Sequence, residues 1–198
     1  MIRADVTGIV LAGGMGRRMG NVDKGLVELN GRPMVAHVLA RFAPQVGDVL
    51  INANQNPDQY AAFGYPVVPD EVGGFAGPLA GLHAGMTRST SPYVATVPCD
   101  SPFLPFDLIA RLAAAIEREH AQLAVARTHA QPHPVFALVR RDVLPHLTAF
   151  LGSGGRKIDA WYGTLKVVEV AFDDDEAAFR NINTAAELSA AATMDRPR

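Results

Sequence analysis

Short apolar runs alternate along the chain with longer stretches in which apolar residues recur at helical spacing. The runs place Val, Ile, Leu and Ala on nearly consecutive positions, which is typical of strands that are buried on both faces. The predicted strands cover residues 8–12, 49–53, 65–68, 93–97, 123–126, 135–139 and 165–171.

Helices are predicted between the apolar runs. In the stretch after Pro33, the apolar side chains of Val35, Val38 and Phe42 share one helical face. The last predicted helix has the capping-box pattern Thr-x-x-Glu at its start. The further expected helices cover residues 78–88, 107–120 and 142–151, and the stretch from residue 184 onward.

Strands that alternate with helices favour a mostly parallel sheet, because parallel neighbours need a crossover connection. We therefore expect an α/β fold, a three-layer Rossmann-like sandwich with helices on both faces of the sheet. Residues 1–192 are predicted to form a single domain and residues 193–198 a frayed tail. In such folds ligands bind at the carboxyl ends of the strands, so the residues that follow each run are the candidates for a site.

The segment 11–25, which follows the first predicted strand, carries the strongest chemical signal. Glycines at positions 13, 14 and 16 let backbone N–H groups approach a ligand closely. Arg17, Arg18 and Lys24 add three positive charges within eight residues. Amides and cations at the exit of a strand predict a polyphosphate-binding loop, although a glycine-rich turn with solvated arginines is the alternative. The P-loop and dinucleotide patterns are both absent from this segment.

Composition narrows the class of protein. With 198 residues, 48% of them hydrophobic and 19% charged, the chain is expected to fold around a core rather than to be disordered. The net charge of −2 argues against general binding to nucleic acid or to a membrane surface. One cysteine and no visible export signal predict a cytoplasmic protein. Of the 18 glycines, six lie in residues 13–31 and five in residues 73–85, where a nucleotide would need close backbone approach.

Asp100 follows the fourth predicted strand. A carboxylate at the carboxyl end of a strand, opposite a phosphate loop, is a suitable Mg²⁺ ligand, since this ion binds one or two carboxylates together with phosphate oxygens. The alternative is a helix cap for the segment beyond Pro102. Cys99, beside it, is interpreted as a small buried side chain.

Asn52 and Asp70 end the second and third strand regions. The amide of Asn52 offers a donor and an acceptor for a base or a ribose, and the Asp70 carboxylate could accept from the amide edge of guanine. Simple turn roles are the alternatives for both residues. The glycine-rich segment 73–78 either covers the nucleotide or only connects two elements.

The second half offers fewer signals. His129 and His133 have a metal-like spacing, but Pro132 and Pro134 exclude a helix there, so a zinc site is not expected. The acidic run 173–176 is interpreted as a solvated turn.

One cation and two amides could hold a second, anionic ligand, although the two amides could equally shape the turn before the last helix. These residues are Arg156, Asn181 and Asn183.

Segment 11–24 matches the signature L-A-G-G-x-x-x-R-M-G-x-x-D-K of nucleotidyltransferases that join a nucleoside monophosphate to a phosphorylated acceptor. Over nearly its whole length, the chain more closely resembles the molybdenum cofactor guanylyltransferase family. The resemblance implies a fold of the nucleotide-diphospho-sugar transferase type. The further matching segments are 23–26, 29–33, 52–54, 77–81, 98–102, 133–134 and 181–184.

The resemblance implies transfer of GMP from GTP to the terminal phosphate of Mo-molybdopterin, with release of pyrophosphate. It implies that residues 1–100 bind the nucleotide and residues 101–192 the acceptor, with His133 and Pro134 in the acceptor pocket. It also implies transient cofactor-handling partner proteins, whereas nucleic acid and membrane are not expected as partners.

The same resemblance assigns residue roles. Catalysis is assigned to Lys24, Asp100 and Arg18, with Arg17 as the alternative to Arg18, and Mg²⁺ binding is assigned to Asp100. Binding of GTP is assigned to Leu11, Ala12, Gly13, Gly14, Lys24, Asn52, Asp70 and Asp100. Contact with molybdopterin is assigned to Arg156, Asn181 and Asn183.

Two alternatives stay open at this stage. One is a cytidylyltransferase of the same fold, acting on the molybdenum cofactor or on a sugar-alcohol phosphate, because base choice depends on few contacts. The other is a non-catalytic module that binds GTP and delivers cofactor. Release of pyrophosphate distinguishes the enzymes from the module.

Overall fold

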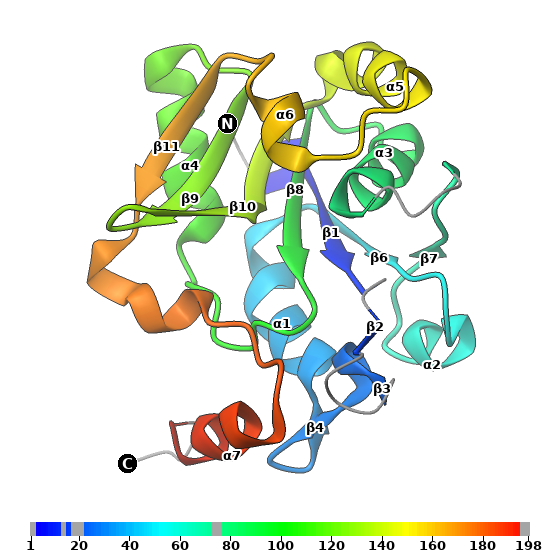
Figure 1. Cartoon of the computed structure of the whole chain (residues 1–198), viewed down its shortest axis with the longest axis vertical. Coiled ribbons are helices and arrows are strands. Elements are labelled where there is room, and N and C mark those ends of the chain that lie inside the picture. Colours follow the sequence, from blue (N-terminus) through cyan, green and yellow to red (C-terminus); the bar gives the residue numbers. More distant parts are fainter. Residues whose placement is uncertain (1–2, 13–14, 17–21, 73–76, 195–198) are drawn as a thin grey trace.

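The computed structural model describes residues 3–12, 15–16, 22–72 and 77–194, and within them a seven-stranded sheet forms the centre of the molecule (Figure 1). The strand order is β11-β9-β10-β8-β1-β6-β7. The strands are β1 (Val6–Leu11), β6 (Asp48–Asn52), β7 (Val67–Val68), β8 (Tyr93–Pro98), β9 (Leu123–Thr128), β10 (Gln131–Arg140) and β11 (Val167–Ala171).

Most neighbouring strands run parallel. Strand β1 pairs in parallel with β6 and β8, β6 with β7, and β9 with β11. Strand β10 runs antiparallel to β8 and β9. Only residues 129–130 separate β9 from β10, which is too short for a parallel crossover and allows only a hairpin. The predicted mostly parallel α/β sheet is therefore confirmed, with one reversed strand.

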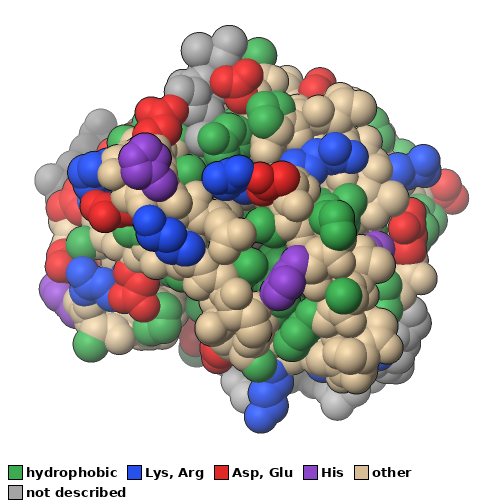
Figure 2. All heavy atoms as spheres, turned by 90° about the horizontal axis from the view of Figure 1, so that it is seen from above, with side chains coloured by type: hydrophobic (Ala, Val, Ile, Leu, Met, Phe, Trp, Pro, Cys, Tyr) green, Lys and Arg blue, Asp and Glu red, His purple; other side chains and the backbone are tan. Residues whose placement is uncertain are grey.

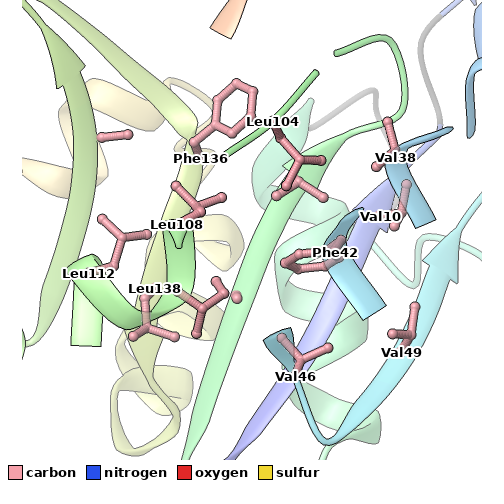
Figure 3. Packing of buried hydrophobic residues seen from close by; sticks show 14 of the residues in the cluster. Val10, Val38, Phe42, Val46, Val49, Leu104, Leu108, Leu112, Phe136 and Leu138 are labelled. Atoms are coloured by element: carbon pink, nitrogen blue, oxygen red, sulfur yellow. The ribbon is translucent and has the colours of Figure 1, made fainter. Parts of the chain in front are cut away.

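Helices cover both faces of the sheet, as expected for a three-layer sandwich. On one face α1 and α4 pack against the strands, and Figure 3 shows Phe42 from α1 and Leu108 from α4 among the strand residues Val10 and Leu138. On the other face a separate cluster joins α3, α5 and α6, with the buried Trp161 in it. These helices are α1 (Met34–Phe42), α3 (Pro78–Arg88), α4 (Leu108–Glu119), α5 (Leu144–Gly152) and α6 (Ile158–Tyr162).

Smaller elements gather at the carboxyl end of the sheet. Helix α2 (Pro57–Ala61) connects β6 to β7, and the hairpin of β4 (Glu28–Leu29) and β5 (Arg32–Pro33) precedes α1. The C-terminal helix α7 (Ala185–Met194) packs on this hairpin through a small cluster around Leu29. Figure 1 shows α7 and β4 side by side at the end toward which β1 and β8 point.

The pattern located each strand of the sheet and the five longer helices, but several bounds differ. Strand β10 begins four residues earlier than expected, and α7 reaches Met194 rather than ending at residue 192. Helices α2 and α6 were not predicted, because each has only five residues. The acidic run 173–176 starts a 3-10 helix, η6 (Asp173–Phe179), and the carboxylate of Asp174 lies 2.9 Å from the guanidinium of Arg111.

Among the described helices, none is long and apolar enough to cross a bilayer. Figure 2 views the molecule from the opposite end, that of the amino ends of β1 and β8. On this face basic and acidic side chains are interspersed.

Candidate functional site

Four parallel strands bring the predicted nucleotide-binding residues to one edge of the sheet. Ala12 follows β1, Asn52 ends β6, Asp70 lies two residues beyond β7, and Asp100 lies two residues beyond β8. The register pairs Leu11 with both Asn52 and Pro98, so these strand ends are level. The N–H of Ala12 donates to the carbonyl of Asn52 at 2.8 Å, which closes the exit of β1 against β6.

Lys24 and Asp100 form the charged centre of this edge. The ammonium of Lys24 lies 3.2 Å from Asp100 Oδ2, and it also donates to Asn183 Oδ1. The Asp100 residue is only 7% exposed. Burial raises the pKa of the Asp100 carboxyl above its ordinary value, although the positive charge of Lys24 acts in the opposite direction.

The raised pKa of Asp100 bears on whether a metal ion fits beside this carboxyl. It means that the ionised carboxylate has too few compensating partners in its buried position. A divalent cation supplies the missing charge, and a carboxylate is a ligand that Mg²⁺ accepts. The described residues contain no cluster of three or more His, Cys, Asp or Glu side chains for a metal.

A second polar group lies at the ends of β6 and β7. Asn52 Nδ2 donates to Asp70 Oδ1 at 2.9 Å and to the carbonyl of Val68 at 3.1 Å. Asn54 Nδ2 donates to Asp70 Oδ2 at 2.8 Å, and the N–H of Asp70 donates to Asn54 Oδ1 at the same distance. Both oxygens of Asp70 are thus oriented by amides. Asn54 was part of a matching segment but had no predicted role.

Helix α3 approaches this group closely at Gly81. A Cβ atom at this position would lie 2.3 Å from Asn52 Oδ1 and 2.5 Å from Leu11 Cδ2. Only glycine lets the first turns of α3 pack against the ends of β1 and β6. Gly81 was noted as part of a motif, and the structure supplies the steric reason for it.

A cavity of about 660 Å³ lies beside the charged centre, between β10, η6 and α7. Asn181, Asn183, His133 and Pro134 line it, and their contact with the acceptor stays a prediction. Arg180 also lines it, although the sequence had not singled it out. Its only signal was its place next to Asn181.

Arg156 lies elsewhere in the fold. Its guanidinium donates to the carbonyls of Leu151 and Gly155 at 2.9 and 2.7 Å, at the end of α5. It is not among the residues that line the cavity. In this structure Arg156 therefore acts as a cap for α5, and its contact with molybdopterin stays a prediction.

Hydrogen bonds fix the backbone of segment 181–183 against Asp100 and Ser101. The N–H of Ile182 donates to the carbonyl of Asp100 at 2.9 Å, and Ser101 Oγ donates to Asn181 Oδ1 at the same distance. Because Asn183 also accepts from Lys24, the segment 181–183 joins the nucleotide edge to the cavity.

His133 forms one wall of the cavity. Its ring stacks on Phe179 at a centroid distance of 4.8 Å, and its Nε2 lies 2.7 Å from Thr128 Oγ1. Burial lowers the pKa of the imidazole, which favours the neutral ring near pH 7.

The predicted role of Cys99 as a small buried side chain is confirmed. It is 6% exposed, and burial raises the pKa of its thiol, so it is packed as a neutral side chain. Several predicted site residues lie outside the described part of the chain, namely Gly13, Gly14, Arg17, Arg18 and segment 73–76.

Comparisons with known proteins identify the family to which the chain belongs. A family model described as the MobA-like NTP transferase domain matches residues 8–167, which is most of the chain. The protein therefore belongs to this family of nucleotidyltransferases.

The similar curated proteins carry a more specific name. A protein from Cupriavidus taiwanensis named molybdenum cofactor guanylyltransferase is 53% identical over 193 residues, covering 95% of this chain and 96% of the relative. A protein of the same name from Bordetella petrii is 52% identical, covering 94% and 96%.

A solved structure supports the fold. The crystal structure of molybdopterin-guanine dinucleotide biosynthesis protein A from Archaeoglobus fulgidus superposes with a TM-score of 0.79 at 24% identity, and covers 95% of this chain and 97% of that one.

Proposed function

We propose that the protein transfers GMP from GTP to the terminal phosphate of Mo-molybdopterin, forming molybdopterin guanine dinucleotide and pyrophosphate. The names of relatives about half identical in sequence support this activity. The observation that carries it is the place of Lys24, whose ammonium contacts Asp100 at the nucleotide edge and Asn183 beside the cavity. One cation therefore lies between a donor site and an acceptor site.

In the proposed reaction an oxygen of the acceptor phosphate attacks the α-phosphorus of GTP. The new P–O bond forms as the bond to the β-phosphate oxygen breaks, and that oxygen leaves with pyrophosphate. The attacking phosphate is already ionised near neutral pH, so the reaction requires no general base. Positioning and charge neutralisation are then the main contributions of the protein.

Lys24 and Arg18 would hold the donor phosphates and stabilise the departing pyrophosphate. Leu11 and Ala12 would place the exit of β1 against the nucleotide, together with Gly13 and Gly14. Asn52 and Asp70 would bind the base or the ribose, since Asn52 and Asn54 orient both oxygens of the Asp70 carboxylate.

Asp100 would hold Mg²⁺, which neutralises phosphate charge and polarises the phosphorus centre when it is bound. The buried carboxylate with its raised pKa supports this assignment. With the charge of Asp100 neutralised by the ion, the Lys24 ammonium, 3.2 Å from this carboxylate, would be available to bind the donor phosphates.

The acceptor would occupy the cavity. Its volume of about 660 Å³ is in the range of pockets for small organic ligands. Asn181, Asn183 and Arg180 line it and offer amides and a cation to an anionic, hydrogen-bonding ligand. Arg156 would need to leave its α5 cap to reach the same ligand, so we rank it below Arg180.

The wider biological setting is also a proposal. A labile acceptor cofactor favours transient delivery and removal by partner proteins in the cytoplasm. The division into a nucleotide half, residues 1–100, and an acceptor half, residues 101–192, is consistent with the two regions described above. Nucleic acid and membrane have no role in the proposed reaction.

A pyrophosphate-release assay with GTP, CTP, ATP and UTP tests the proposal, each with and without molybdopterin. We expect release with GTP only when molybdopterin is present. Release with CTP instead indicates the cytidylyltransferase, and binding of GTP without release indicates the non-catalytic module. Lys24→Ala should reduce turnover at low GTP by about 10- to 100-fold, the scale of one lost charged hydrogen bond.

A further inference from the structure

The turn that carries Lys24 is short and needs support from elsewhere. Lys24 begins the 3-10 turn η3 (Lys24–Leu26), which follows the two-residue strand β3 (Val22–Asp23). Such a short strand and turn provide few backbone hydrogen bonds. The side chain of Asp23 does not cap η3 either, although it stands at the cap position. Other contacts must therefore fix the origin of the Lys24 side chain.

Helix α2 supplies these contacts through the carboxylate of Asp23. The hydroxyl of Tyr60 donates to Asp23 Oδ1, and Asn56 Nδ2 donates to Asp23 Oδ2 at 3.0 Å. Both donors are more than 30 residues away in sequence from Asp23. The residue directly before Lys24 is thus held at both carboxylate oxygens by the segment between β6 and β7.

Tyr60 is the more rigid of the two donors. It is fully buried, whereas Asn56 is exposed. Its ring belongs to the core cluster that covers one face of the sheet, and it lies 6.5 Å from the ring of Phe63. Burial raises the pKa of the Tyr60 hydroxyl, so it stays protonated and remains a donor at any physiological pH.

Gly25 shows how tightly the same hydroxyl fits the turn. A Cβ atom at Gly25 would lie 2.5 Å from the Tyr60 oxygen and 3.2 Å from both Cβ and Sγ of Cys99. Tyr60 therefore contacts the residues on both sides of Lys24. Cys99 in turn precedes Asp100. The residues next to Lys24 and next to Asp100 therefore pack against each other.

We infer that Tyr60 is a positioning residue for Lys24: its hydroxyl, anchored by the buried ring, holds Asp23 and so aims the Lys24 ammonium at Asp100 and Asn183. The inference rests on the proposed function, in which Lys24 holds the donor phosphates. Among the hydrogen bonds of the described residues, the Tyr60 hydroxyl bonds to Asp23, whereas Asp100 and Asn183 bond to Lys24. Its effect on the reaction must pass through the turn.

Tyr60→Phe tests the inference because it removes only the hydroxyl and keeps the buried ring. We expect kcat/KM for GTP to fall about tenfold, equal to about 1.4 kcal/mol, with the KM for the acceptor unchanged. The midpoint of thermal unfolding should change by only a few degrees. Tyr65→Phe is the matched control, since Tyr65 is half-buried against the same core cluster but lies with Thr7 and Asp48 at the amino ends of β1 and β6, and it should behave as wild type.

A double-mutant cycle tests the route through the carboxylate. Asp23→Ala and Tyr60→Phe should each reduce kcat/KM for GTP, and the double variant should be no worse than Asp23→Ala alone. Losses that multiply in the double variant would overturn the inference, because the hydroxyl would then act independently of Asp23. Wild-type kinetics of Tyr60→Phe would overturn it as well.

Hydrogen exchange at the amides of residues 23–29 provides a readout that does not need turnover. Faster exchange of this segment in Tyr60→Phe, with unchanged exchange in β1 and β8, supports the inference. Equal exchange in the variant and wild type overturns it. If wild type releases no pyrophosphate with GTP and molybdopterin, the proposed function fails, and the exchange result still decides whether Tyr60 holds the turn.

Discussion

At the scale of single residues, the site depends on a carboxylate whose ionised form is only partly compensated. Among the described residues Asp100 forms an ion pair with Lys24, and its pKa is raised because burial outweighs that attraction. Such a group is retained for what it binds rather than for stability, since a neutral side chain of the same shape would avoid the cost of desolvation.

Asp100→Asn keeps the shape of the side chain and removes its charge. We expect transfer of GMP to fall by about 100-fold or more, the scale at which loss of one charge-stabilising group affects an enzyme. The free energy of unfolding at pH 7 should change by no more than about 1 kcal/mol, because Lys24 keeps its contact with Asn183. Pyrophosphate release and urea unfolding measure the two effects. Near-normal Mg²⁺-dependent transfer in this variant would disprove the assignment of Asp100.

His133 gives a prediction for the pH dependence of stability. The ordinary pKa of 6.5 applies to the unfolded chain, whereas burial lowers the pKa in the fold. Between these two values the unfolded chain binds a proton that the folded chain does not. The free energy of unfolding should therefore decrease as the pH falls below 6.5. Above that pH His133 is neutral in both states and no longer changes the stability.

The variant His133→Gln isolates that contribution, because it can still bond to Thr128 but does not titrate. Urea unfolding of both proteins from pH 5 to pH 8 should show a shallower decrease below pH 6.5 in the variant. The other five histidines are common to both proteins and cancel in the difference. Parallel curves would show that His133 titrates alike in the folded and unfolded chains.

The sequence allowed prediction of those site residues that follow directly from strand order. Asn52, Asp70 and Asp100 stand at or just after strand ends, and parallel strands bring such ends together. Asn54 and Tyr60 act through side-chain hydrogen bonds between loops and a short helix, and the paths of these segments are not encoded in a periodic pattern. Arg180 was not predicted for the same reason, because it lies in the irregular segment between η6 and α7.

At the scale of elements, the predicted capping box of α7 is supported by the bond from Glu187 to Thr184. The N–H of Glu187 donates to Thr184 Oγ1 at 3.2 Å, as the pattern requires. The Glu187 carboxylate also accepts from the N–H of Asn183 at 2.7 Å, one residue before Thr184. The cap thereby also fixes the backbone of a residue that contacts Lys24.

Thr184→Ala should weaken α7 by about 1 kcal/mol, the usual cost of losing a helix cap. Native-state hydrogen exchange of residues 185–194 measures the local opening free energy. Ser189→Ala is the matched control: the Ser189 hydroxyl bonds to the carbonyl of Ala185 within the helix, and alanine has the higher helix propensity. The prediction is wrong if both variants open with the same free energy.

The limits of prediction at this scale are physical. Helices α2 and α6 have five residues each, which is less than two turns and too short for a periodic signal. The direction of β10 depends on the length of its connection to β9, and the apolar content of a strand does not show it. The longer helices α1 and α4 show the helical period clearly, whereas α3 is buried along most of its length and was found from Pro78 at its start; all three were found with bounds close to those observed.

At the scale of the whole molecule, the two faces of the sheet are covered by separate clusters while the site lies at one end. The first cluster includes α1 and α4, and the second includes α3, α5 and α6. The third cluster fastens α7 and Ile182 to the hairpin before α1. The segment 181–183 thus joins the cavity to the strand ends that carry the candidate nucleotide-binding residues. Its contact with Lys24 spans 159 residues of sequence, which no local pattern predicts.

Ligand binding at this junction should stabilise the whole fold. A ligand present at one hundred times its Kd adds about 2.7 kcal/mol to the free energy of unfolding. For a domain of this size, each kcal/mol raises the melting temperature by about 2–4 °C, so saturating MgGTP should raise it by about 5–10 °C. Lys24→Ala at the same concentration should show a smaller shift, because a charged contact to the phosphates is lost. Tyr65→Phe, which lies away from the site, should match wild type. A larger shift with MgCTP than with MgGTP would reverse the proposed base preference, and equal shifts in wild type and Lys24→Ala would remove Lys24 from the donor site.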